Sequence, residues 1–339
     1  MIFAPSPFLL KDVSVSQVMT QVCVALIPGI AAYAWLVGPA ILVQLVIATF
    51  AALFAEAAML KLRGKPLALF LSDGSAIVTA WLIALTFPPL APWWMVFTGT
   101  IFAIVFAKHL YGGLGQNPFN PAMVAFAVCI VSFPALMSQW PAVGLELRLV
   151  DQIDIIFGLA PRVDALTSAT PLDAMKTALR MGDGNFDIAQ LLANQDIYGN
   201  FAGRGWEWVA AGYLIGGLWL WHRRVISWQV PVAFIGSLTL ISGALWLYNP
   251  AAFANPIFHL FSGGTLLGAF FIATDPVSGC TTPRGKLIFG AGAGLLAYII
   301  RVFGGFPDGV AFAVLLMNLS APVIDLLTQP AIFGMKGKK

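Results

Sequence analysis

The sequence predicts an all-α polytopic membrane protein with about ten transmembrane helices, arranged as two inverted five-helix repeats around a long outer loop. The first observation behind this prediction is composition. Of the 339 residues, 59% are hydrophobic and 10% are charged, and the mean hydropathy is +0.87. A soluble globular chain carries about 25% charged residues, so most of this chain is expected to lie in lipid. The net charge of +3 gives no indication of nucleic-acid binding, because the basic residues lie at helix ends.

Ten apolar segments supply the second observation. A helix that crosses a bilayer needs roughly 17–25 mostly apolar residues. The segments 69–87 and 258–274 are the weakest, because they are short and rich in Gly, Ser and Thr. No basic stretch, apolar run and cleavage site opens the chain, so we expect no cleaved signal peptide. The predicted spans are residues 18–37, 39–60, 69–87, 93–111, 119–138, 206–222, 228–247, 258–274, 286–303 and 309–328.

An internal repeat, with an offset of about 190 residues, is the third observation. SDGSAIVTAWLIALTFPP (Ser72–Pro89) resembles SGGTLLGAFFIATDPV (Ser262–Val277), and KHLYGG (Lys108–Gly113) resembles RVFGG (Arg301–Gly305). Because each half carries an odd number of spans, the second half must enter the membrane from the opposite side. Inverted repeats with Gly-interrupted segments at matching positions are typical of transporters, with the site near the midplane.

The Lys and Arg residues of the short loops predict the orientation, because cytoplasmic loops carry an excess of them. Basic residues follow the second, sixth and eighth spans and end the chain, whereas the loops TFPPLAPWW and YNPAAFANP carry no charge. Both termini are therefore expected in the cytoplasm. The predicted organisation is a first membrane repeat over 1–138, an outer loop over 139–205, and a second repeat with a cytoplasmic tail over 206–339. A loop of this length is usually functional or disordered.

The outer loop contains a hydroxyl-rich turn, TSAT at 167–170, directly before a stretch with helical character. We expect Thr170 to be the N-cap of a helix, Pro171 its first residue, and Asp173 the partner that completes a capping box. No His or Lys stands within a few residues to activate the Thr170 hydroxyl as a nucleophile. The same geometry suits a phosphate, because the N–H groups at a helix N-terminus favour anions.

Charged residues within the spans or at their ends are further candidates, because charge in a membrane is costly and often marks an ion path or a site. Asp73 and Asp275 lie beside Gly and Pro at what we take as equivalent ends of the two repeat segments. Interrupted helices there would expose carbonyls and helix ends to a cation or a flavin. Lys108, Arg301 and Asp308 are expected at the membrane interface, with side chains that extend toward the headgroups.

Several patterns argue against other chemistry. GGLGQNPFNPAM (112–123) follows a membrane helix rather than a strand, so it is not a dinucleotide fingerprint. We expect a tight cytoplasmic turn there, with Asn117 and Asn120 bonded to the backbone. The three cysteines are far apart and form no C-x-x-C pair, so no iron–sulfur cluster and no other metal site is predicted.

Long stretches of the chain resemble one family, the D subunits of the Rnf (Rsx) electron transport complexes. More distantly, the chain resembles the B subunits of sodium-translocating NADH:quinone reductases. The similarity covers essentially the whole chain and is carried by SDGSAIVTAWLIALTFPP, KHLYGGLGQNPFNPAM, DALTSATPLDAMKT, FFIATDPVSGCTTPRGKLIFG and GGFPDGVAFAVLLMNLSAPVID. The resemblance implies a multi-pass subunit of an ion-translocating oxidoreductase in the bacterial inner membrane, with residues 139–205 in the periplasm. Alone the chain would not be a complete enzyme, because no NADH site is visible.

The resemblance also implies a cofactor and partners. In that family FMN is joined by a phosphoester to the last Thr of a Ser/Thr-Gly-Ala-Thr motif by a separate flavin transferase. Here the motif reads Thr167, Ser168, Ala169, Thr170, so Thr170 is the expected acceptor, and Ser168 departs from the usual Gly. The relatives also hold riboflavin non-covalently, for which no residue is assigned beyond Asp73 and Asp275 as candidates. The implied partners are the A, B, C, E and G subunits, of which G also carries a covalent flavin.

Two other function classes stay open at the level of sequence. A cofactor-free channel or secondary transporter for a small polar solute would also use inverted repeats and the small-residue segments after Ser72 and Ser262. The family's helical body is similar in fold to urea channels, although a simple channel has no use for a hydroxyl turn in a long outer loop. A scaffold for other subunits predicts neither flavin nor any effect of Thr170→Ala on electron transfer.

Overall fold

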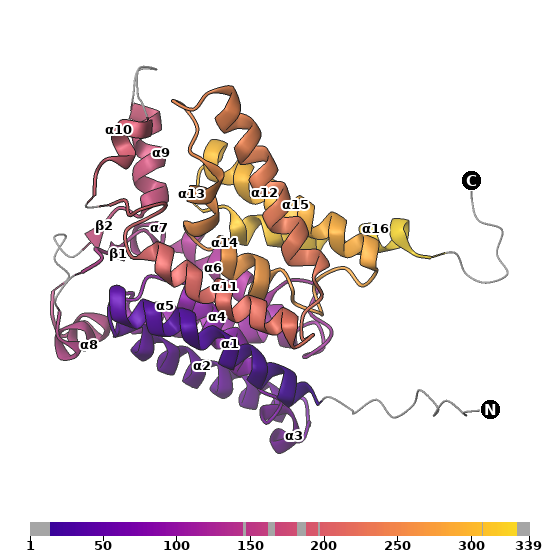
Figure 1. Cartoon of the computed structure of the whole chain (residues 1–339). Coiled ribbons are helices and arrows are strands. Elements are labelled where there is room, and N and C mark those ends of the chain that lie inside the picture. The colour runs from indigo at the N-terminus through magenta and orange to yellow at the C-terminus, as the bar shows by residue number, and fades with distance from the viewer. Residues whose placement is uncertain are drawn as a thin grey trace, which may run out of the picture.

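The structure is a computed structural model that describes residues 14–144, 147–161, 167–181, 188–195, 197–306 and 308–330. These residues are almost entirely helical (Figure 1). The elements before the outer loop are α1 (Val15–Leu36), α2 (Ala40–Leu62), α3 (Leu67–Leu71), α4 (Ser75–Thr86), α5 (Trp93–Phe102), η1 (Ala103–His109), α6 (Pro121–Ser132) and α7 (Pro134–Met137). Of these, η1 is a π-helical continuation of α5.

The outer loop has short elements of its own, and a second set of helices follows it. The elements of the loop are β1 (Trp140–Pro141), α8 (Leu149–Phe157), β2 (Thr167–Ser168), α9 (Pro171–Met181) and α10 (Ile188–Leu192). The later elements are α11 (Trp206–His222), α12 (Gln229–Tyr248), α13 (Pro256–Phe261), α14 (Thr265–Leu267), the π-helical η3 (Gly268–Ile272), α15 (Pro283–Phe303) and α16 (Val310–Thr328). Figure 1 shows β1, β2 and α8–α10 gathered at one side of the helical bundle, whereas α1 begins and α16 ends at the opposite side.

Five helices are long and apolar enough to cross a membrane, namely α1, α2, α12, α15 and α16. Each coincides with a predicted span to within a few residues at either end. The helix α11, which fills the predicted span 206–222, has 17 residues, and α5–η1 and α6 are shorter apolar helices. The described residues therefore confirm a mostly helical, polytopic membrane protein.

The two weakest predicted spans are interrupted rather than continuous. Ser72–Gly74 separates α3 from α4, and Ser262–Gly264 separates α13 from α14. Gly74 has φ +78° and Gly263 has φ +62°, in the left-handed region that glycine adopts without a Cβ clash. The chain therefore leaves the helical conformation at both places, and the backbone groups that are freed there need partners.

Helices α1 and α11 join the two parts of the chain, and glycine allows their close approach. Gly212 lies against Gly29, and Gly216 lies against the carbonyl group of Ala25, so that a Cβ on either α11 glycine would collide with the α1 backbone. Elsewhere α12 packs along α15, α15 along α16, and α2 along α4. One buried apolar core runs through all of these contacts.

We expect Gly216→Ala to lower the thermal unfolding midpoint of the detergent-solubilised chain, because the new methyl group has no space beside Ala25. Overpacking of this kind costs about 1–3 kcal/mol. Gly236→Ala on α12 is the matched control, since a Cβ there meets no atom within 4 Å and alanine has the higher helix propensity. An equal fall in both variants would contradict the close packing of α1 on α11.

Candidate functional site

Thr170 forms the N-terminal cap of α9. Its Oγ1 accepts the backbone N–H of Asp173 at 3.2 Å, and its carbonyl oxygen accepts the N–H of Ala174 at 2.8 Å. The predicted cap and the helix start at Pro171 are confirmed. Between these two described residues, the Thr170 N–H does not donate to the Asp173 carboxylate in return, so the predicted capping box is incomplete. The half-buried hydroxyl thus lies where the N–H groups of the first helical turn favour an anion.

The residues before Thr170 form the strand β2 instead of a continuous turn. Thr167 pairs with Pro141 and Ser168 with Trp140 in an antiparallel two-stranded sheet. Ser168 Oγ donates to the carbonyl oxygen of Ala169 at 3.3 Å. Because β1 holds β2 in place, the point at which the chain enters α9 is fixed from a distant part of the outer loop.

The start of α9 is braced by the turn Tyr198–Gly203. The Tyr198 hydroxyl donates to the carbonyl oxygen of Pro171 at 3.2 Å. Burial raises the pKa of Tyr198, so the hydroxyl stays a neutral donor at physiological pH. Gly203 packs so closely on Pro171 that a Cβ there would collide with the proline ring. The buried carboxylate of Glu207 accepts two backbone N–H groups of the turn, each at 3.2 Å.

Thr170 also lines a cavity of about 150 Å³ whose walls come from α1, α4, α6, α11, α14–η3 and α16, together with α7, β1 and the start of α9. The Tyr33 and Tyr213 hydroxyls are buried and have no hydrogen-bond partner among the described residues. A buried hydroxyl without a partner costs about 1–3 kcal/mol, so this pair is suited to hold the polar edge of a bound group. The aromatic side chains that line the cavity are Tyr33, Phe126, Trp140, Trp206 and Tyr213.

A smaller cavity of about 30 Å³ adjoins the TSAT motif and is lined by Ser168, Thr170 and Arg204, among others. Guanidinium groups bind phosphate with two parallel hydrogen bonds. Arg204 and the N-terminus of α9 therefore suit a phosphate ester on Thr170. Sequence reasoning missed Arg204, because it lies far along the chain from Thr170 and no spacing pattern connects the two.

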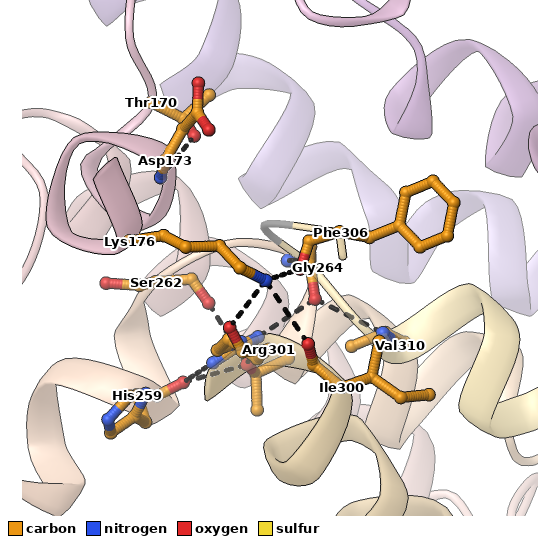
Figure 2. A network of polar contacts seen from close by, with 12 residues as sticks. Thr170, Asp173, Lys176, His259, Ser262, Gly264, Ile300, Arg301, Phe306 and Val310 are labelled. Carbon is orange, nitrogen blue, oxygen red and sulfur yellow. Dashed lines mark hydrogen bonds and ion pairs between the residues drawn. The ribbon is translucent and has the colours of Figure 1, made fainter. Parts of the chain in front are cut away.

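A polar network surrounds the buried Arg301 side chain (Figure 2), and two of its members, Gly264 and Asp308, line the larger cavity. Arg301 Nη1 donates to the carbonyl oxygen of His259 at 2.7 Å, and Nη2 donates to Thr265 Oγ1 at 2.7 Å. Arg301 Nη2 also lies 3.1 Å from Asp308 Oδ1. Asp308 Oδ2 accepts the N–H of Gly264 at 2.6 Å, and both residues line the cavity that Thr170 lines.

The prediction that Arg301 extends toward the headgroups is wrong, because Arg301 is only 3% exposed. For Asp308, whose side chain is 26% exposed, the interfacial position stays a prediction. Their partners surround the interruption between α13 and α14, where the carbonyl of His259 and the N–H of Gly264 have lost helical partners. The bonds at the interruption hold the Arg301 charge inside the protein, with the partly exposed Asp308 beside it.

The first half contains a corresponding network. Lys108 Nζ bonds the two Glu56 carboxylate oxygens at 2.9 and 2.8 Å and the Ser75 hydroxyl at 2.9 Å. His109 Nε2 lies 3.1 Å from Glu56 Oε1. Ser75 begins α4 as Thr265 begins α14, so a buried cation bonds the first hydroxyl after each interruption.

The prediction of an interfacial Lys108 is wrong as well, since this residue is 2% exposed. Its partner Glu56 was not among the candidates from the sequence. A lone carboxylate within the second apolar span, near its end, was the signal that could have found it. An isolated charge at that depth requires a buried partner of opposite sign.

Asp73 and Asp275 do not occupy equivalent ends of the two repeat segments, so that expectation is wrong. Asp73 precedes α4, and its Oδ1 accepts the N–H and the hydroxyl of Ser75 at 2.7 and 2.6 Å. Asp275 follows η3 and accepts the N–H of Val277 at 3.1 Å and the hydroxyl of Ser278 at 2.7 Å. Asp275 lines an open cavity of about 960 Å³ between the ends of several helices. Among the described residues, the hydrogen-bond partners of Asp73 and Asp275 are different, and no bond links the two carboxylates.

Asn117 and Asn120 hold the turn before α6, as predicted. Asn117 Nδ2 donates to the carbonyl oxygen of Phe119 at 3.1 Å, and Asn120 Oδ1 caps α6. The sequence did not predict that Asn120 also reaches the second half. Its N–H donates to Asn318 Oδ1 at 3.0 Å, and its Nδ2 donates to the carbonyl oxygen of Ile272 at 3.3 Å. These bonds tie α6 to the wall of the Thr170 cavity.

We expect Lys108→Met to lower the free energy of unfolding by about 3–5 kcal/mol, because it leaves the buried Glu56 carboxylate without its ammonium partner and with His109 alone beside it. Adding Glu56→Leu to this variant should recover most of the loss. The check is thermal or denaturant unfolding in detergent. Arg148→Gln is the matched control, since the Arg148–Asp151 pair is exposed and should contribute nothing measurable. A loss as small as that of the control would contradict a buried pair.

The sequence matches the model of the NQR2, RnfD, RnfE family over residues 2–334. It is 48% identical over 349 residues to the D subunit of the ion-translocating oxidoreductase complex of Yersinia pseudotuberculosis serotype O:1b (strain IP 31758), with 98% of each chain covered. It is 46% identical over 346 residues to the protein of the same name from Escherichia fergusonii, with 98% of this chain and 97% of that one covered. The chain therefore belongs to the NQR2, RnfD, RnfE family.

Proposed function

We propose that this chain, a membrane subunit of an ion-translocating oxidoreductase complex, carries electrons on FMN esterified through its phosphate to Thr170. The proposal rests on the position of the Thr170 hydroxyl, which caps α9 and borders two adjoining cavities. The larger cavity has aromatic walls, which suit an isoalloxazine ring. The smaller one is lined by Arg204, which suits a phosphate.

Each part of the site would have a separate task. The N–H groups of the first turn of α9, together with Arg204, would neutralise the phosphate. The Tyr33 and Tyr213 hydroxyls would bond the polar edge of the ring, and the aromatic walls would exclude water from it. The flavin supplies the redox chemistry when it is bound, and the chain supplies position and electrostatics.

We propose further that all ten apolar segments cross the membrane as two inverted five-helix repeats. The interruptions at matching places support this arrangement, as does the repeated cation–hydroxyl contact, Lys108 with Ser75 and Arg301 with Thr265. The basic loops would lie in the cytoplasm with both termini. Residues 139–205 would then lie in the periplasm of a bacterium, and the position of β1–α10 at the side opposite to the start of α1 supports this orientation (Figure 1).

Other subunits would deliver and remove the electrons. The family resemblance implies the A, B, C, E and G subunits as partners and a flavin transferase for maturation. The moved cation, or a non-covalent riboflavin, has two candidate places. Asp275 lines the open cavity together with Lys286, and Asp73 Oδ2 is buried without a hydrogen-bond partner among the described residues.

A cofactor-free channel or secondary transporter is the second candidate function, and the cavity between the two halves is the observation that favours it. The two functions make different demands on the start of α9. The cavity wall includes Thr170, Pro171 and Leu172, so a solute that passed through the cavity would have to displace them. A redox subunit needs no such displacement.

We expect the chain, produced together with its flavin transferase, to gain the mass of one FMN less one water and to fluoresce in a denaturing gel. Thr170→Ala should lose all of this signal, because it removes the ester oxygen. Thr177→Ala is the matched control, since Thr177 is exposed on α9 and lies outside the motif. An unmodified mass, in a preparation that modifies a known acceptor, would remove the anchor and favour the transporter.

A further inference from the structure

Lys176 lies on the same helix as the proposed cofactor anchor and reaches into the second half of the molecule. It is 7% exposed, and Nζ donates to the carbonyl oxygen of Phe306 at 2.6 Å and to that of Arg301 at 3.2 Å. A third carbonyl oxygen, that of Ile300, lies at 3.4 Å. Figure 2 shows the side chain extending from α9 to the end of α15. The ammonium thus caps the C-terminus of α15, where the helix dipole favours a cation.

The first half closes the matching helix end without a lysine. There the N–H of Gly112 bonds the carbonyl oxygen of His109 at 3.1 Å, and the N–H of Gly113 bonds that of Lys108 at 3.0 Å. A turn of two glycines therefore satisfies the helix end from within the same half. In the second half this task falls partly to Lys176, which belongs to the outer loop.

One residue connects Lys176 to the cavity wall. Lys176 bonds the backbone carbonyl of Arg301, and the Arg301 side chain bonds Thr265 at the interruption and Asp308 beside it. Asp308 in turn bonds the N–H of Gly264. Hydrogen bonds to the backbone and the side chain of Arg301 therefore connect α9 to residues that line the cavity next to Thr170.

We propose that Lys176 is a positioning residue for the flavin site. It fixes α9 against the end of α15 and so sets where a ring attached at Thr170 lies relative to Asp308 and Gly264. The cofactor part of this inference rests on the proposed function, whereas the position of α9 does not. Covalent attachment needs only the accessible hydroxyl of Thr170, so it does not depend on Lys176.

The first test uses Lys176→Met in the full-length chain produced together with its flavin transferase, without the flavin-bearing G subunit. In-gel fluorescence should show undiminished covalent FMN. The bound flavin should show lower fluorescence anisotropy, faster quenching by iodide and a shifted midpoint potential. Lys176→Arg, which keeps the charge, should restore these values at least in part. Lys65→Met, at an exposed lysine, should change none of them. Unchanged anisotropy, quenching and potential in Lys176→Met would overturn the inference.

The second test needs no flavin. Spin labels at Thr177→Cys on α9 and Phe303→Cys on α15, both exposed positions, report the distance between the two helices in a chain whose native cysteines are replaced. We expect a narrow distance distribution in the parent and a broader one in Lys176→Met. Lys176→Gln serves with the same expectation if the methionine variant does not fold.

The two tests separate the two proposals. An unchanged distance distribution overturns the positioning role, whether or not FMN is bound. A broader distribution in a chain that carries no FMN, although it was produced with an active flavin transferase, supports the role of Lys176 in fixing α9 and contradicts the proposed cofactor.

Discussion

A buried cation at an interrupted helix is the interaction on which the rest of this structure depends. Both interruptions free backbone groups, and in a membrane protein an unsatisfied group costs several kcal/mol. Before α4 the Asp73 carboxylate accepts the N–H of Ser75, and around α14 Arg301 bonds the carbonyl oxygen of His259 while Asp308 accepts the N–H of Gly264. The buried cations Lys108 and Arg301 each also bond the first hydroxyl of the helix that resumes. The charges at the second interruption therefore have a structural task before any other.

The candidate site follows from the second interruption. Because Gly263 and Gly264 carry no Cβ, Asp308 and Leu172 pack directly against the turn, and the cavity that Thr170 lines lies beside it. Asp308 holds the turn open by accepting the N–H of Gly264. The outer loop completes the wall, with β1 and Tyr198 fixing the start of α9. A reactive cofactor placed at Thr170 would thus border both halves of the molecule.

The sequence alone predicted what depends on local pattern. Apolar runs predicted the helix positions, Gly and Ser predicted the weak segments, and Thr170-Pro171 predicted a helix start, as the structure confirms. It could not predict what depends on tertiary contact. Arg301 looks interfacial when only its distance from the span end is considered, because its partners Thr265 and Asp308 are recognisable only after folding. Arg204 was missed for the same reason.

The most direct test is a cryo-electron microscopy map of the complete complex, purified with its flavin transferase present. We expect density continuous with Thr170 Oγ1, a phosphate beside Arg204, and a planar ring between the two halves within reach of the Tyr33 and Tyr213 hydroxyls. A ring that extends away from the cavity, or a cavity closed by side chains while flavin is attached elsewhere, would contradict the site described for Thr170.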